Sequence, residues 1–255
     1  MKVFFIGAGP GAADLITVRG VQILGRAPVV LYAGSLVSKA ILVHCRADAR
    51  VINTAKLSLD EQEVYYRHAR DQNLDVARLH SGDPSIYGSV AEQMRRLDRL
   101  GIPYEVVPGV SSFLAAAALL NSELTKPEVA QTIILTRSGG RASAVPEKES
   151  LQSLAVHTTT MCVFLSGAQL TRVVSELLAH YEPKTPVALV QKATWPEERI
   201  WFGSLERIAD EIIPAEWELS TMLIVGEALN REAGIESCLY SASYSHRYRR
   251  SKKKA

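Results

Sequence analysis

Membrane-spanning segments and disulfides are the first features missing from this sequence. No apolar run approaches the ~20 residues that a transmembrane helix needs. The N-terminus has no basic stretch followed by an apolar core and a cleavage site. The three cysteines, Cys45, Cys162 and Cys238, are scattered and odd in number, which argues against a disulfide framework or a cysteine metal site. These absences predict a cytoplasmic protein without membrane association.

Several catalytic motifs are also missing. The sequence has no H-E-x-x-H or C-x-x-C pair, no G-x-S-x-G nucleophile turn and no P-loop. We therefore predict no bound metal, no serine nucleophile and no phosphate-loop chemistry. The six histidines are dispersed along the chain. His80 precedes a glycine-rich loop, and there a structural role is favoured over acid–base catalysis.

Charge is unevenly distributed. The formal net charge of +2 includes six cations within the last ten residues, HRYRRSKKKA, so the rest of the chain is mildly acidic. A basic tail can bind nucleic acid or another anionic surface, but a run of like charges also resists packing. We expect residues 237–255 to be a disordered, solubilising tail, and we do not expect nucleic acid as a partner.

The order of apolar segments predicts an α/β fold with two domains. Of the 255 residues, 47% are hydrophobic and 22% are charged, which suits one large domain or two small ones. Strands and helices alternate up to about residue 120, as in a parallel sheet. Adjacent strands in the second half indicate a mixed sheet. We predict an N-terminal domain over 1–121, a C-terminal domain over 122–236 and an active-site cleft between them.

Residue patterns also place individual elements. Thr17 and Ser58 suit helix N-caps, and Ser58 with Glu61 forms a capping box. Later helices are predicted over 89–100, 113–120, 170–180 and 205–212. Strands are predicted from Lys2 and over 29–32, 50–53, 74–79, 103–107, 132–135, 161–164, 187–190, 199–202 and 222–225.

The stretch GAGPG, Gly7–Gly11, satisfies a dinucleotide-binding pattern, Gly7-x-Gly9-x-x-Ala12. That site would point backbone N–H groups at a pyrophosphate, yet Pro10 has no N–H to offer. It would also place an acidic residue after the next strand, where the sequence has Ala33-Gly34-Ser35. The turn therefore favours a nucleoside ligand without a phosphate over a nicotinamide cofactor.

Two more glycine-rich loops follow predicted strands: SGDPSIYG, Ser81–Gly88, and VPGVSS, Val107–Ser112. If the sheet is parallel, all three loops share its carboxyl edge, where open α/β sheets bind ligands. Pro84 biases Asp83 towards extended backbone and so gives its carboxylate a defined direction. Each loop alone could be an ordinary strand-to-helix turn, and only their number favours a site.

Other chemistry-bearing residues leave two readings open. Arg137 and Arg141, in TRSGGRASAVP, could grip carboxylates in pairs, or they could be solvated surface. Trp195, in ATWPEER, could line a cleft or cap a core.

Taken together, these motifs resemble the tetrapyrrole (corrin/porphyrin) methyltransferase family. The resemblance is carried by the opening GAGPGAADLITVRG, by SGDPSIYG and VPGVSS, and by the later TPVALVQKAT and STMLIVGEAL, and it extends to about Leu229. The segments VVLYAGSLV and LTRSGGRASAVPE are similar to the branch that methylates precorrin-4 at C-11 in cobalamin biosynthesis. Nothing in the family pattern accounts for the basic tail.

The resemblance implies S-adenosylmethionine as methyl donor, with S-adenosylhomocysteine as product, a small tetrapyrrole as substrate and a homodimer. It identifies no catalytic acid or base beyond Asp83 as a candidate, and it suggests Arg137 and Arg141 for substrate carboxylates. Alternatives are cobalt-precorrin-4, uroporphyrinogen III, or RNA modification by a member of the same superfamily. The implied donor-binding residues are Pro10, Gly82, Asp83, Pro84, Ile86, Ser111, Ser112, Ser166, Ala193, Thr221 and Met222.

Overall fold

The computed structural model describes residues 1–139, 144–164, 166–237, 239 and 241–251. Contacts between Cα atoms divide the chain into two compact units. The first unit comprises Met1–Ala116 with Lys192–Arg199, and the second comprises Ala117–Gln191 with Ile200–Ala255. A segment late in the sequence thus belongs with the first unit, an exchange that the contiguous bounds 1–121 and 122–236 do not include. Those bounds and the tail 237–255 stay a prediction.

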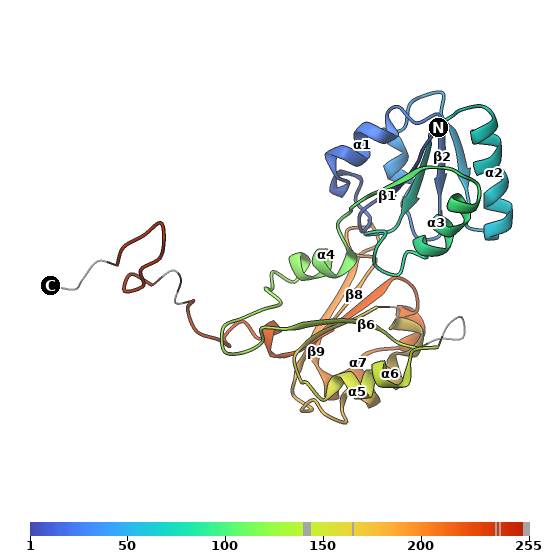
Figure 1. The fold of residues 1–255 in the computed structure, drawn as a ribbon. Helices are drawn as coiled ribbons and strands as arrows, with labels where there is room; N and C mark the ends of the chain where they lie inside the picture. The colour runs from blue at the N-terminus through green and yellow to red at the C-terminus, as the bar shows by residue number, and fades with distance from the viewer. Residues whose placement is uncertain (140–143, 165, 238, 240, 252–255) are drawn as a thin grey trace. The chain divides into compact units, whose positions relative to one another are not determined.

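The first unit is a parallel five-stranded sheet with the order β3-β2-β4-β1-β5 (Figure 1). Its apolar residues alternate between two faces, because successive side chains of a strand point in opposite directions. Phe4 and Ile6 pack with α1, whereas Val3 and Phe5 pack with α2 and α3. The strands are β1 (Val3–Gly7), β2 (Val29–Tyr32), β3 (Arg50–Asn53), β4 (Val76–His80) and β5 (Tyr104–Val107). The helices are α1 (Val18–Leu24), α2 (Leu59–Asp71) and α3 (Val90–Arg99).

The second unit holds a mixed five-stranded sheet with the order β6-β7-β10-β8-β9. β6 and β7 are parallel, while β10 is antiparallel to both β7 and β8. Helices α5, α6 and α7 cover one face of this sheet (Figure 1). The strands are β6 (Ile133–Arg137), β7 (Thr160–Phe164), β8 (Pro186–Gln191), β9 (Arg199–Ser204) and β10 (Thr221–Val225). The helices are α5 (Leu151–Ala155), α6 (Leu170–Leu177) and α7 (Ile208–Glu211), and α4 (Ser112–Leu119) crosses the boundary between the units.

The α/β fold, with one parallel and one mixed sheet, confirms the predicted fold class. Local signals were accurate: the Thr17 side chain accepts from Gly20 N, and Ser58 with Glu61 forms both halves of a capping box. The predicted helix 205–212 is instead a 3-10 turn, Leu205–Arg207, followed by the short α7. The helix predicted to His180 ends at Leu177, and Tyr181 packs into the core beyond it.

Candidate functional site

Three glycine-rich loops leave neighbouring strands of the first sheet. β1 lies between β4 and β5, and all three run parallel. The carboxyl ends of these strands lead directly into the GAGPG, SGDPSIYG and VPGVSS loops. Their shared position at one sheet edge, expected from the sequence, is thereby confirmed. A parallel α/β sheet binds its ligands at this edge.

The backbones of the three loops meet at Gly7, Gly82 and Gly109. A Cβ atom on Gly7 would lie 2.5 Å from Gly109 Cα and 2.7 Å from the Gly82 carbonyl oxygen. A Cβ atom on Gly109 would lie 2.3 Å from that same oxygen. Side chains cannot occupy these positions, so glycine permits the close approach of the loops.

The Asp83 carboxylate ties two of the loops together. One oxygen, Oδ2, accepts from Gly109 N at 2.8 Å, and the other, Oδ1, accepts from Ser85 N at 2.8 Å. A carboxylate accepting backbone N–H groups makes charge-assisted hydrogen bonds, which are stronger than neutral ones. Asp83 therefore organises the loop junction, a structural task that its position before Pro84 did not reveal.

Internal partners use the backbone N–H groups of the GAGPG turn. Ala8 N donates to His80 O at 2.8 Å, Gly9 N to Gly82 O at 3.3 Å, and Ala12 N to the Thr194 hydroxyl at 2.9 Å. Pro10 has none to donate. A pyrophosphate would need these groups to be free. The structure thus agrees with the sequence argument against a dinucleotide.

The remaining donor-site candidates of the first unit lie around this junction. Gly82 has a positive φ of 61°, and a Cβ there would sit 3.6 Å from Ser111 Cα and Ser112 N. Ala193 is adjacent to the GAGPG loop, since a Cβ on Gly11 would lie 3.0 Å from its carbonyl oxygen. Pro10 and Pro84 are buried, and Ile86 is half-buried on the SGDPSIYG loop. Their contact with a donor stays a prediction.

In the second unit, three further candidates gather at one edge of the mixed sheet. Ser166 follows the carboxyl end of β7, and Thr221 and Met222 begin the antiparallel β10. Ser166 is fully buried, and its hydroxyl donates to Thr221 O at 3.4 Å. The Thr221 hydroxyl in turn donates to Trp217 O at 2.6 Å. Both hydroxyls thus have protein partners, and a role in donor binding stays a prediction.

The proposed substrate cation Arg137 ends β6 at this same edge, where it pairs in register with Phe164 of β7. Its guanidinium donates to the carbonyl oxygens of Ser138 at 3.4 Å and Ala144 at 3.2 Å. The Arg137 guanidinium therefore already has backbone acceptors within the second unit. Arg141 lies outside the described residues.

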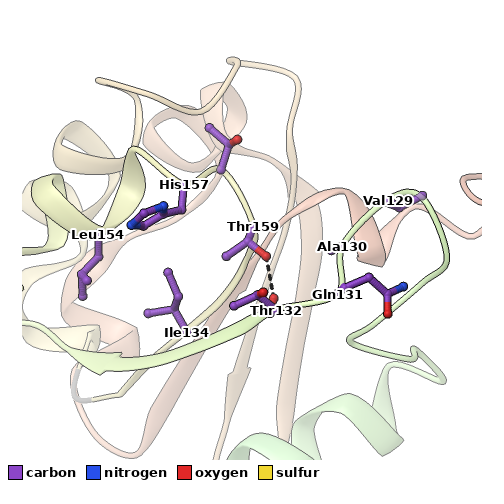
Figure 2. A pocket seen from close by; sticks show the side chains of 9 residues that line it. Val129, Ala130, Gln131, Thr132, Ile134, Leu154, His157 and Thr159 are labelled. Atoms are coloured by element: carbon purple, nitrogen blue, oxygen red, sulfur yellow. Dashed lines mark hydrogen bonds between the residues drawn. The ribbon is translucent and has the colours of Figure 1, made fainter.

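A cavity of about 600 Å³ lies elsewhere in the second unit (Figure 2). Thr132 and Thr159 line it and immediately precede β6 and β7, so it opens at the amino ends of these parallel strands. Arg137 and Ser166 stand at their carboxyl ends. None of the predicted site residues lines this cavity, and we do not place the site there.

A buried polar cluster underlies the SGDPSIYG loop. Arg78, 5% exposed, donates to Thr54 Oγ1 at 2.7 Å and to Gln93 Oε1 at 3.2 Å. His80, 6% exposed, has a pKa of about 3 because burial disfavours the imidazolium and Arg78 repels it, while a hydrogen bond to the Gly88 backbone opposes both. A neutral, buried His80 fits the structural role favoured from the sequence.

Acid should therefore destabilise the protein through His80. The unfolded state, with a histidine pKa near 6.5, binds a proton before the folded state does. The stability that this neutral group contributes is fully present above pH ~6.5 and is lost as the pH falls towards 3, by up to about 1.4 kcal/mol per pH unit. Urea unfolding at pH 6.5 and 5 should show a loss of about 2 kcal/mol that His80→Phe largely removes. Equal pH slopes in both proteins would contradict this assignment.

The sequence of the chain matches that of a known protein family. The model of the family Tetrapyrrole (Corrin/Porphyrin) Methylases matches residues 2–209. The chain belongs to the tetrapyrrole methylase family. The match runs through both units, so it includes strands of both sheets.

Individual tetrapyrrole methylases resemble the chain over most of its length. A precorrin-4 C(11)-methyltransferase from Sinorhizobium is 49% identical, with 98% of each chain covered. A crystal structure of a cobalt precorrin-4 methyltransferase matches at 42% identity with a TM-score of 0.85, covering 89% of this chain and 95% of the other. A uroporphyrin-III C-methyltransferase from Thermus thermophilus, complexed with S-adenosylhomocysteine, matches at 29% identity and a TM-score of 0.75, covering 93% and 97%.

The similarity extends further along the chain than the sequence motifs indicated. An alignment that covers 98% of 255 residues must include most of the tail 237–255. The expectation that the resemblance ends near Leu229 agrees with the family model, which ends at residue 209, whereas the alignment with this relative continues further. That expectation rested on glycine-rich and strand motifs, and the tail contains neither.

Two residues at the site were not predicted from the sequence. Gly109 was quoted within VPGVSS but given no role, although glycine in a turn after a strand can permit close backbone approach. Thr194 had no such signal, because its partner Ala12 is 182 residues away. Among the described residues, no group of three metal-ligating side chains could hold a metal ion, and no helix there has the length and apolarity needed to cross a bilayer.

Proposed function

We propose that this tetrapyrrole methylase transfers a methyl group from S-adenosylmethionine to C-11 of precorrin-4, giving precorrin-5 in cobalamin biosynthesis. The observation that carries the proposal is the 49% identity, across 98% of both chains, to a protein named for this reaction. Relatives named for cobalt-precorrin-4 are less similar, at 44% and 42% identity. We therefore place the metal-free substrate first.

The first unit suits such a methyl donor. The GAGPG turn has committed its N–H groups at Ala8, Gly9 and Ala12 to internal partners. A nucleoside without phosphate does not need them. The glycine junction brings the backbones of the three loops together at the carboxyl end of the first sheet, where an open α/β sheet binds its ligand.

In the proposed reaction, the main role of this chain is to position the methyl donor and the accepting ring carbon. S-adenosylmethionine supplies an electrophilic sulfonium methyl group when bound. The loops must hold the donor so that the accepting ring carbon, the methyl carbon and sulfur lie in line. Correct alignment alone can contribute up to about 7–11 kcal/mol to lowering a barrier. No described residue has to act as acid or base, and Asp83, engaged with two backbone amides, is better explained as an organiser than as a catalyst.

The substrate class carries many carboxylates, and we propose Arg137 and Arg141 as cations that seat it. We also propose that the protein is a homodimer, as the family resemblance implies, and that it is cytoplasmic, as the scattered cysteines suggest. Light scattering at working concentration tests the oligomeric state, and a monomer there would contradict it.

Ligand binding should separate this proposal from the dinucleotide alternative. We expect S-adenosylhomocysteine to bind and NADH not to bind, because Pro10 has no N–H group and those of Ala8, Gly9 and Ala12 already donate within the protein. Isothermal titration calorimetry with both ligands on the same preparation measures this. Heat from NADH, with none from S-adenosylhomocysteine, would contradict the assignment of the turn.

Mass spectrometry of reaction products tests the function itself. The purified protein is incubated with S-adenosylmethionine and, separately, with precorrin-4, cobalt-precorrin-4 and uroporphyrinogen III. We expect a single added methyl group, formed fastest on precorrin-4. Preference for uroporphyrinogen III would move the protein to another branch of the family. Methylation of RNA with no tetrapyrrole product would overturn the proposal.

A further inference from the structure

The segment Lys192–Arg199, here called the strap, joins two strands of the second sheet but belongs to the first unit. It connects β8 to β9, which are neighbouring strands of the second sheet. Its own contacts nevertheless place it in the first unit. A connection between two adjacent strands needs only a few residues, so the strap is longer than the connection requires.

The strap makes hydrogen bonds to Pro10 in the GAGPG turn and to Ala12, which directly follows the turn. The Trp195 indole Nε1 donates to Pro10 O at 2.8 Å, and Ala12 N donates to the Thr194 hydroxyl at 2.9 Å. Between these two bonds the indole lies against Gly11. A Cβ atom there would come within 2.2 Å of Trp195 Cδ1.

Two residues of the strap have backbone angles that are rarely found for their residue types. Lys192 and Thr194 both have positive φ angles, 48° and 67°, and a β-branched residue is rarely found in this region. Such strain persists only where surrounding contacts fix it, and it gathers at functional sites. Here Glu198 Oε2 accepts from Thr194 N at 2.6 Å, and Trp195 N donates to Lys192 O at 2.9 Å.

The two halves of the turn are thus fixed by different parts of the chain. Ala8 and Gly9 bond to His80 and Gly82 next to the end of β4, whereas Pro10 and Ala12 bond to the strap. We propose that Trp195 and Thr194 are positioning residues, which hold Pro10–Ala12 in the conformation that receives the methyl donor. This inference rests on the proposed function, because it assumes that the turn belongs to the donor site.

The test removes one hydrogen bond at a time. Trp195→Phe keeps an aromatic ring but loses the donor to Pro10. Thr194→Val keeps the β-branch but loses the acceptor for Ala12. Each should weaken S-adenosylhomocysteine binding about fivefold, the factor expected for one neutral hydrogen bond. The KM for S-adenosylmethionine should rise likewise, while the KM for precorrin-4 and the melting temperature stay near the wild-type values.

Two matched variants separate positioning from folding. Thr194→Ser retains the hydroxyl and should bind as the wild type does. Trp201→Phe loses a comparable indole bond, to Glu211 Oε2 at 3.1 Å in the second unit, and should leave donor binding unchanged. A steric arm adds Gly11→Ala, whose Cβ meets the indole. We expect its binding defect to be partly relieved when Trp195→Ala is combined with it.

The outcomes distinguish the inference from the function beneath it. If the wild type binds S-adenosylhomocysteine and both Trp195→Phe and Thr194→Val bind it equally well, the strap has no positioning role. The same conclusion follows if Thr194→Ser is as weak as Thr194→Val. If the wild type itself fails to bind the ligand, the proposed function is wrong and the inference falls with it.

Discussion

Replacing Gly109 by alanine should both destabilise the protein and abolish measurable donor binding. The new Cβ would lie 2.3 Å from the Gly82 carbonyl oxygen and 2.7 Å from Gly7 Cα. Both are backbone atoms, so no flexible side chain can move aside to relieve the clash, and the loops must separate. Forcing extra atoms into packed structure costs about 1–3 kcal/mol. Urea unfolding gives the stability change, and calorimetry with S-adenosylhomocysteine gives the affinity.

Gly25→Ala is the matched control. Gly25 ends α1 with φ −64°, a conformation open to any residue, and its Cβ would meet nothing closer than 3.4 Å. We expect this variant to bind donor normally and to lose no stability. Normal donor binding in Gly109→Ala would show that the meeting of the three loops is irrelevant to the ligand.

Asp83→Ala should weaken donor binding at least about tenfold, equivalent to about 1.4 kcal/mol. The substitution leaves Gly109 N and Ser85 N without their carboxylate acceptor. Two loops of the junction then lose the bond that sets their spacing, and hydrogen bonds to a charged group are worth about 1.5–3 kcal/mol each. Titration calorimetry measures the affinity, and thermal unfolding shows whether the variant is folded.

A second carboxylate provides the control for Asp83. Asp75 accepts from Lys2 N at 2.7 Å, a bond of the same type at the opposite, amino-terminal end of β1 and β4. Asp75→Ala should lower stability but leave donor affinity unchanged. If Asp83→Ala, while folded, binds S-adenosylhomocysteine as the wild type does, the SGDPSIYG loop returns to an ordinary strand-to-helix turn.

The parts of the site that follow strands were predictable because their signals are local. Gly7 ends a strand, Gly82 and Gly109 each come two residues after one, and parallel strands bring such positions to one edge. The caps at Thr17 and Ser58 were predictable for the same reason: the donor and acceptor lie three residues apart.

Long-range partnerships escaped the sequence argument. Trp195 and Pro10 are 185 residues apart. The positive φ angles of Lys192 and Thr194 were also unpredictable, because lysine and threonine rarely adopt them. The burial of Arg78 in β4 was also not predicted. Its guanidinium is buried because it donates hydrogen bonds to Thr54 and Gln93, which come from other parts of the sequence. Local patterns identify where a turn lies, whereas its partners depend on the tertiary fold.

The position of the transferred methyl group tests the central claim most directly. Members of this family share a methyl donor, so the seating of the tetrapyrrole must select the carbon that reacts, and a displacement in line tolerates little misplacement. Precorrin-4 is incubated with the protein and S-adenosylmethionine carrying a carbon-13 methyl group, and the product is examined by carbon-13 NMR. The account predicts one enriched methyl resonance, attached to C-11. Enrichment at another ring carbon, or no enrichment from precorrin-4, would contradict it.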